Sequence, residues 1–299
     1  MRFLKSSFIG LTTLILILLD LIIGFGTLAI INIPRAIVPI KSFKVYLSKV
    51  SNFIGDITVY NLKVIMLIMH GNNIQVINNN NNDDDEYALD EWYMAMSNHQ
   101  SWADIFILLA SANYKIPLLK FFMKKELWWI PFIFLANKTL NMPFVNRHTR
   151  DEILKDPSLR LRDYENTLKS CKRFLRSPST IFSYAEGTRY SEEKHKAQNS
   201  PYKNLLVPKV GGMATALSAM PKINTLIDYS VIYKSKKRDA WSFLTGQMCE
   251  VKVLVTKYEI PDSLKNRNYS DDDQYRNDFK KWIESIWIIK DADIERLKF

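Results

Sequence analysis

The order of apolar and polar residues divides this chain into an apolar N-terminal stretch and a longer part in which strand-like and helix-like segments alternate. Residues 8–31 are apolar apart from three threonines and Asp20, and such a stretch can cross the roughly 30 Å hydrocarbon layer of a bilayer. The stretch is too long for the apolar core of a signal peptide, so we expect a retained membrane anchor. Val59–Met69 is shorter and carries Asn61 and Lys63, which favours an interfacial or packed helix over a membrane span.

Beyond residue 86 the periodicity predicts an α/β domain. Strand-like runs occur at Trp92–Ser97, Thr180–Ser183, Leu226–Tyr233 and Glu250–Tyr258. Helix-like runs occur at Ile105–Ala110, at Arg160–Arg176 and near the C-terminus, where Phe279, Trp282, Ile283 and Ile286 share one side. Such alternation implies an α/β fold with a mostly parallel sheet flanked by helices. We expect residues 1–58 to form the membrane anchor with a basic juxtamembrane segment, and residues 59–299 to form the α/β domain.

The net charge of +10 indicates an anionic partner, which could be nucleic acid, anionic lipid or an acidic small molecule. More Lys and Arg residues follow the apolar stretch, up to Lys49, than precede it. The positive-inside rule therefore favours a cytoplasmic location for the bulk of the chain. The Asn- and Asp-rich run 78–86 has nothing to bury, so we expect a flexible surface insertion there.

Several common site types are missing from the sequence. Cys171 and Cys249 lie far apart, and none of the four histidines belongs to an H-E-x-x-H arrangement, so neither a disulfide framework nor a metal site is expected. The chain has no G-x-S-x-G elbow, no phosphate-binding P-loop and no G-x-G-x-x-G after a strand. These absences argue against most serine hydrolases, NTPases and dinucleotide-binding enzymes.

The most informative stretch is residues 98–104, in which His99 stands five positions ahead of Asp104 between a strand-like and a helix-like run. Ser101 is expected to cap the helix, which puts Asp104 in its first turn, where the helix dipole favours a carboxylate. That carboxylate can accept the Nδ1 proton of His99 and leave Nε2 free to take a proton from a bound hydroxyl. A single histidine near a helix start is often structural, so this pair alone leaves both interpretations open.

A second motif, Tyr184–Arg189, follows the strand-like run 180–183 and reads Y-A-E-G-T-R. Together the two motifs resemble N-H-x-x-x-x-D and F-P-E-G-T-R of the glycerolipid acyltransferase family, typified by 1-acyl-glycerol-3-phosphate acyltransferase. Pro143–Arg147 resembles the second motif of that family, with Asn141 where the family usually has Gly, and Val207–Gly212 resembles the fourth. The resemblance runs from Tyr93 to Tyr233 and is nearest to a branch of Gram-negative inner-membrane acyltransferases.

The resemblance implies the acyltransferase fold and a step of phospholipid biosynthesis. A fatty acyl group would move from acyl-CoA or acyl carrier protein to the free hydroxyl of a lysophospholipid, most simply 1-acyl-glycerol-3-phosphate, giving phosphatidic acid without a covalent enzyme intermediate. His99 would be the general base and Asp104 would orient it. Acceptor binding would fall to Lys125, Arg147, Glu186, Gly187, Thr188 and Arg189. The two arginines would hold the phosphate, and Glu186 would bond the glycerol hydroxyl or orient an arginine. No metal or cofactor is expected, since the acyl carrier is a co-substrate.

The sequence is compatible with several alternatives. The acceptor could be lysophosphatidylglycerol, lysocardiolipin or glycerol-3-phosphate, and a non-catalytic lipid-binding membrane protein is the competing class. Nucleic-acid binding rests on charge alone. The aromatic run Leu127–Phe132 could line an acyl tunnel, although a place in the core is favoured. The basic segment Lys234–Arg238 could be a solvated loop, a membrane contact or a site for coenzyme A phosphates or acyl carrier protein. The membrane is expected to be a bacterial inner membrane.

Overall fold

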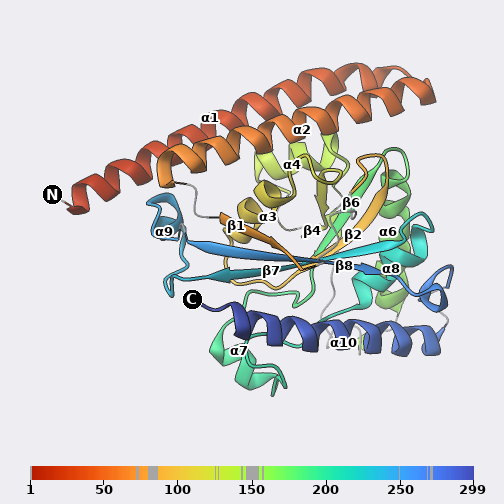
Figure 1. Ribbon diagram of the computed structural model, residues 1–299. Helices are drawn as coiled ribbons and strands as arrows, with labels where there is room; N and C mark the ends of the chain where they lie inside the picture. Colours follow the sequence, from red (N-terminus) through yellow and green to blue (C-terminus); the bar gives the residue numbers. More distant parts are fainter. Residues whose placement is uncertain are drawn as a thin grey trace.

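The computed structural model describes residues 2–71, 74–79, 87–124, 126, 128–142, 144–145, 155–156, 158–248, 250–267, 269 and 272–299. Two long helices, α1 (Arg2–Ile37) and α2 (Lys41–His70), lie side by side as a hairpin across the rest of the molecule (Figure 1). The shorter helices are α3 (Asp104–Ala112), α4 (Pro131–Thr139), α6 (Ser158–Phe174), α7 (Glu192–Ala197), α8 (Gly211–Ala219), α9 (Ala240–Leu244) and the 3-10 helix η2 (Asp262–Leu264). The C-terminal helix is α10 (Asp273–Leu297).

A six-stranded sheet with the order β1-β8-β7-β2-β6-β3 forms the centre of the molecule. Its strands are β1 (Ile74–Asn78), β2 (Trp92–Ser97), β3 (Leu119–Phe121), β6 (Ser179–Tyr184), β7 (Thr225–Tyr233) and β8 (Val251–Glu259). Neighbouring strands run parallel except for the antiparallel pair β7–β8. Two short strands, β4 (Met123–Lys124) and β5 (Phe144–Val145), form a separate parallel pair. The predicted α/β fold with a mostly parallel sheet is confirmed.

The sheet has an apolar core on each face. On one side Phe121 and Phe182 pack with Ile107 of α3 and with the hairpin residues Leu28 and Leu62. On the other side α6, α8 and α10 cover the sheet, with Trp287 and Phe279 fully enclosed. Every residue of β7 is buried, as expected for a strand covered on both faces. Figure 1 shows the resulting layers of hairpin, helices, sheet and C-terminal helix.

The helix α2 differs most from expectation. Val59–Met69 is not a short element but the last part of a 30-residue helix, and the expected domain boundary at residue 58 lies inside that helix. Both α1 and α2 are long and apolar enough to cross a membrane by length and composition. Small residues explain the difference, since the buried stripe of α2 includes Ser48, Ser51 and Gly55. These residues let helices approach closely without raising the apolar content of the sequence.

Small and polar side chains lie where the two helices of the hairpin contact each other. A Cβ atom on Gly24 of α1 would lie 2.4 Å from the Oγ1 atom of Thr58 in α2. Nearby, the amide of Asn61 donates a hydrogen bond to Asp20 at 3.0 Å, so the one acidic residue of the apolar stretch faces the other helix. The opposite faces of both helices expose large apolar side chains such as Ile23, Ile30 and Phe53.

The start of the expected surface insertion belongs to the sheet. Asn78 ends β1, a strand that the periodicity does not predict, and the amide N–H of Asn79 bonds to the carbonyl of Val255 at 2.9 Å. Residues 80–86 lie outside the described part of the chain.

Candidate active site

Three neighbouring parallel strands deliver the candidate residues to one edge of the sheet. β2, β6 and β7 end at Ser97, Tyr184 and Tyr233, and the loops that follow them carry the first motif, the third motif and the basic segment. Ligands of open α/β sheets bind at this carboxyl edge because the side chains of several loops converge there.

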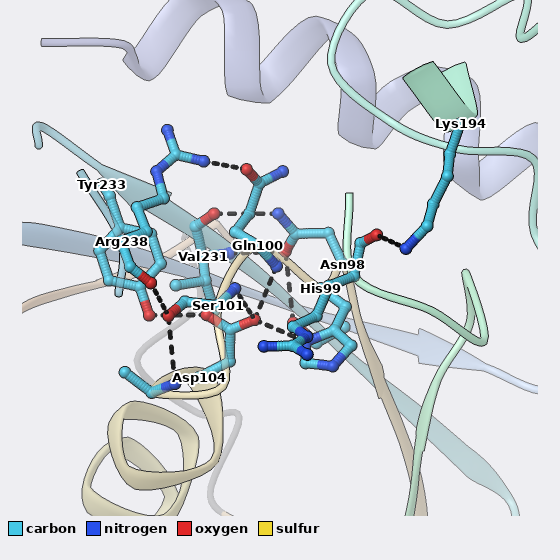
Figure 2. A network of polar contacts seen from close by, with 12 residues as sticks. Asn98, His99, Gln100, Ser101, Asp104, Lys194, Val231, Tyr233 and Arg238 are labelled. Atoms are coloured by element: carbon cyan, nitrogen blue, oxygen red, sulfur yellow. Dashed lines mark hydrogen bonds and ion pairs between the residues drawn. The ribbon is translucent and has the colours of Figure 1, made fainter. Parts of the chain in front are cut away.

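His99 and Asp104 form the predicted pair. The Nδ1 atom of His99 lies 2.8 Å from Oδ2 of Asp104, and the same oxygen accepts hydrogen bonds from the backbone N–H groups of Gln100 at 2.7 Å and Ser101 at 3.0 Å (Figure 2). The Asp104 side chain is fully buried, whereas that of His99 is 18% exposed. The Nε2 atom has no hydrogen-bond partner among the described residues, and His99 lines a cavity.

The N-terminus of α3 differs in detail from expectation. Asp104 lies in the first turn, as predicted, but the residue before the helix is Ala103, and Ser101 caps the turn that precedes it. The Ser101 hydroxyl accepts from the N–H of Ala103 at 3.2 Å and donates to the carbonyl of Arg238 at 2.8 Å. The prediction of Ser101 as helix cap is therefore wrong by two residues, because its side chain bonds the loop and not the helix.

The third motif forms a turn that is fixed to the His99 loop. The N–H of Tyr190 donates to the carbonyl of His99 at 2.7 Å, and the N–H of Lys209 donates to that of Ala185 at 2.6 Å. Gly187 has a φ of +68°, and a Cβ atom there would lie 3.0 Å from the side chain of Lys209. Glycine is therefore required at this position both by its conformation and by its neighbour.

Thr188 and Arg189 lie on the open side of this turn. The ammonium group of Lys194 in α7 donates to the Thr188 hydroxyl at 2.8 Å and to the Arg189 carbonyl at 2.9 Å, and Figure 2 shows Lys194 reaching toward the site. The Arg189 side chain is exposed and forms no ion pair with any residue in the described ranges. Its guanidinium group is available to an anionic ligand.

Glu186 lies behind the turn and not on its open side. It is fully buried, and its oxygens form no hydrogen bond of normal geometry with described residues. Burial raises the pKa of Glu186 to about 8, although the charge of Lys290 and the nearby amides of Leu206 and His99 act in the opposite direction. The expected roles of Glu186, a bond to the glycerol hydroxyl or the orientation of an arginine, stay predictions, since neither oxygen bonds a described residue.

A cavity of about 610 Å³ begins beside His99 and Arg189 and extends to the hairpin. Its walls are mostly apolar and include Phe25 of α1, Leu62 of α2, Phe106 of α3, Phe132 of α4, Phe121 of β3 and Phe182 of β6. The ring of Tyr184 also lines it and stacks on His99, with ring centroids 3.9 Å apart and planes 14° apart. The imidazole of His99 and the guanidinium group of Arg189 therefore line the same mostly apolar space.

The aromatic run near α4 is divided between the cavity and the surface. Phe132 lines the cavity, whereas Trp128 and Trp129 are 61% and 69% exposed, so the favoured placement of this run in the core is wrong. Leu127 lies outside the described residues, as do two expected phosphate ligands, Lys125 and Arg147. Within the described ranges no cluster of three or more metal-ligating side chains occurs.

Sequence reasoning missed the contribution of β7 to the site. The hydroxyl of Tyr233 donates to Oδ1 of Asp104 at 2.6 Å, and Asn98 exchanges two hydrogen bonds with the backbone of Val231 at 2.8 and 2.9 Å. Arg238 donates to the side-chain oxygen of Gln100. The signal in the sequence was the position of Tyr233 at the end of a strand-like run, but only the strand order puts that end beside His99.

Comparison with known proteins identifies a family. The sequence model of the Acyltransferase family matches residues 73–234. The chain is 25% identical over 228 residues to the 2-acyl-1-lysophosphatidylinositol acyltransferase of Saccharomyces cerevisiae, and the alignment covers 69% of this chain and 57% of the yeast protein. The chain thus spans little more than half of that relative. The crystal structure of the 1-acyl-sn-glycerophosphate acyltransferase from Thermotoga maritima aligns over 100% of this chain and 99% of that chain, with a TM-score of 0.49 and 15% identity.

Proposed function

The chain belongs to the Acyltransferase family, and we propose that it transfers a fatty acyl group from a thioester donor to the free hydroxyl of a lysophospholipid. The observation that carries this proposal is that His99, paired with Asp104, lines a mostly apolar cavity. A mostly apolar cavity beside a free imidazole nitrogen fits a reaction in which one substrate is an acyl chain and the other a hydroxyl.

The chemistry requires a base but no covalent intermediate. A glycerol hydroxyl is a weak nucleophile at neutral pH, and removal of its proton by Nε2 of His99 during attack would raise the rate by about 10²–10⁴-fold. Asp104 holds the Nδ1 proton, which fixes the tautomer and stabilises the imidazolium that forms. The thiol of the donor leaves when the tetrahedral intermediate collapses, and the imidazolium can return the proton to it.

The apolar cavity would hold the acyl chain. Each methylene that leaves water contributes about 0.8 kcal/mol, so a cavity lined by Phe, Leu and Ile side chains from both the hairpin and the domain favours a long chain. The exposed Trp128 and Trp129 and the apolar outer faces of α1 and α2 support contact of this side of the molecule with a bilayer. Lysophospholipid could then enter from the membrane. We further propose that this membrane is a bacterial inner membrane and that the active site lies on its cytoplasmic side.

The acceptor would carry a phosphate that Arg189 binds. A guanidinium group suits a phosphate because its donors form a planar fork, and Arg189 is free at the mouth of the cavity. Arg147 and Lys125 are the further ligands that the family motifs imply. The simplest acceptor is 1-acyl-glycerol-3-phosphate. A lysophosphatidylinositol is the second candidate, because the yeast relative is named for such a substrate.

The donor would be acyl-CoA or acyl carrier protein. The segment Lys234–Arg238 follows β7 beside the site, and it retains exposed charge because Lys236 forms no ion pair with described residues. Lys234 and Lys237 are paired with Glu250 and Asp239 at 2.7 and 3.7 Å. Phosphates of coenzyme A or acidic groups of a carrier protein are the partners that such a segment would attract.

Replacement of the base tests the proposal. His99→Ala should lower the rate of acyl transfer at least about 10²-fold, because the proton acceptor is lost, while membrane association and circular dichroism stay unchanged. The measurement is transfer of labelled acyl groups by the purified protein in mixed micelles. His195→Ala is the matched control, since His195 bonds the carbonyl of Tyr202 and lies outside the cavity lining. Near-normal turnover by His99→Ala would reject the mechanism.

A panel of acceptors separates the remaining candidates. The purified protein would be supplied with each donor and with lysophosphatidate, lysophosphatidylinositol, lysophosphatidylglycerol, lysocardiolipin and glycerol-3-phosphate. Binding of these lipids without any acyl transfer would instead favour the non-catalytic, lipid-binding function.

A further inference from the structure

We propose that Tyr233 is a positioning residue of this site, which holds the Asp104 carboxylate in the orientation that directs His99. The inference rests on the proposed function and assigns one further residue to the proposed reaction. Tyr233 is the last residue of β7 and is 6% exposed. Its hydroxyl donates a hydrogen bond of 2.6 Å to Oδ1 of Asp104, a residue 129 positions away in the sequence.

The four hydrogen bonds to Asp104 are not equivalent. Oδ2 accepts from the Nδ1 atom of His99 and from the N–H groups of Gln100 and Ser101, so these bonds all come from the short loop that also carries the base. Oδ1 accepts from Tyr233, and this is the bond that ties the carboxylate to the sheet. Without the bond from Tyr233, the carboxylate could rotate about χ2, a torsion with a broad distribution of values in Asp. Either oxygen could then accept the hydrogen bond from Nδ1 of His99.

The surroundings of Tyr233 hold its hydroxyl in place. β7 is hydrogen-bonded on both sides, to β2 and to β8, and Asn98 joins the strand to the His99 loop through the backbone of Val231. The guanidinium of Arg238 lies over the Tyr233 ring, 5.5 Å from its centroid. Burial and the neighbouring Asp104 carboxylate keep the pKa of Tyr233 well above its ordinary value, so the hydroxyl remains a proton donor.

The same geometry predicts which kinetic constant depends on Tyr233. Its side chain is not part of the cavity lining, so it should not affect how tightly either substrate binds. It acts on the orientation of His99, which matters when the proton moves. The loss of the hydroxyl should therefore lower kcat and leave KM unchanged.

Removal of the hydroxyl alone tests the proposal. We expect Tyr233→Phe to lower kcat about tenfold, as for a lost hydrogen bond to a charged group, with unchanged KM for donor and acceptor. Tyr229→Phe is the matched control, because Tyr229 is buried in the same strand and makes no contact with Asp104. The same substitution in an Asp104→Ala background should have no further effect, since Tyr233 acts through that carboxylate.

A second measurement does not depend on turnover. With four histidines in the chain, ¹⁵N-histidine NMR can resolve the Nδ1 proton of His99, assigned by its absence in His99→Ala. Tyr233→Phe should move this resonance, whereas Tyr229→Phe should not. If the wild type shows no acyl transfer, the proposed function fails and the resonance decides the positioning role. Two results in an active enzyme would overturn the positioning role: a kcat that Tyr233→Phe leaves unchanged, or an equal loss of kcat in the Asp104→Ala background. In an inactive protein, a His99 resonance that Tyr233→Phe does not move would overturn it.

Discussion

Two residues of the third motif, close together in sequence, face different surroundings. Arg189 reaches the open end of the cavity, while Glu186 points into the interior, where Lys290 of α10 is enclosed with Asp228. The Lys290 ammonium donates to Asp228 and to the carbonyl of Tyr229, both at 2.7 Å. The motif therefore combines a cation that faces the cavity with a buried carboxyl group that lies against the rest of the fold.

The buried carboxyl group should make stability depend on pH. Its pKa is raised from an ordinary value of 4.5 to about 8, so the folded state favours the neutral form and loses stability as the pH rises through that interval. Glu186→Gln cannot ionise. We expect its melting temperature to exceed that of the wild type by a margin that grows from pH 4.5 to about 8.

The measurement is thermal unfolding over this pH range, with Glu193→Gln as a control for the loss of one exposed charge. A margin that stays constant with pH, or that grows toward acid, would contradict the assignment of Glu186 as a buried neutral group.

At the scale of elements, the hairpin depends on close approach of α1 and α2. The two helices pack along their lengths, and their outer faces remain apolar and exposed. In such a pair the small residues set the distance between the backbones. The contact of Gly24 with Thr58 is the tightest example, and the hydrogen bond from Asn61 to Asp20 lies close to it.

A single methyl group should disturb this contact. Gly24→Ala would put its Cβ atom 2.4 Å from Oγ1 of Thr58, so the helices must separate, at an expected loss of about 1–3 kcal/mol in the free energy of unfolding. Gly26→Ala is the matched control, because a Cβ atom at that position would have nothing within 4 Å and alanine is the better helix former. Denaturation of both variants in the same detergent measures the difference, and equal stability of the two would show that the contact is not tight.

At the scale of the whole molecule, the cavity exists because the hairpin covers the α/β domain. Its lining comes from helices before residue 71 and from strands and helices after residue 99, so neither part encloses it alone. Gly55 of α2 lines the cavity, and a Cβ atom there would lie 2.8 Å from Cδ2 of Leu118. Side-chain volume at this position therefore controls the space between the two parts.

We expect Gly55→Val to shift donor preference toward shorter acyl chains, because the added methyl groups reduce the length of chain that can be buried. The measurement is kcat/KM across donors of increasing chain length, with Gly26→Val as the control outside the cavity lining. An unchanged preference together with normal stability would argue that the acyl chain does not enter this cavity.

The sequence by itself determined the features that depend on neighbours along the chain. The strand before His99 and the helix that carries Asp104 in its first turn follow from local patterns, and the five-residue spacing allows the imidazole and the carboxylate to meet. The mostly parallel sheet followed from the alternation of elements. The placement of the predicted ligand Arg189 at the cavity mouth also agrees with its position after a strand.

Only the tertiary structure decided which residues distant in the sequence contact the His99 loop and the third motif. Tyr233 meets Asp104 because β7 lies next to β2, and local patterns do not encode strand order. The length of α2 was hidden because serine and glycine, not apolar residues, form part of its buried stripe. Glu186 is buried where the charge of Lys290, a residue of the distant helix α10, acts on it. Such contacts depend on packing, in which the fit of whole elements against one another selects the partners.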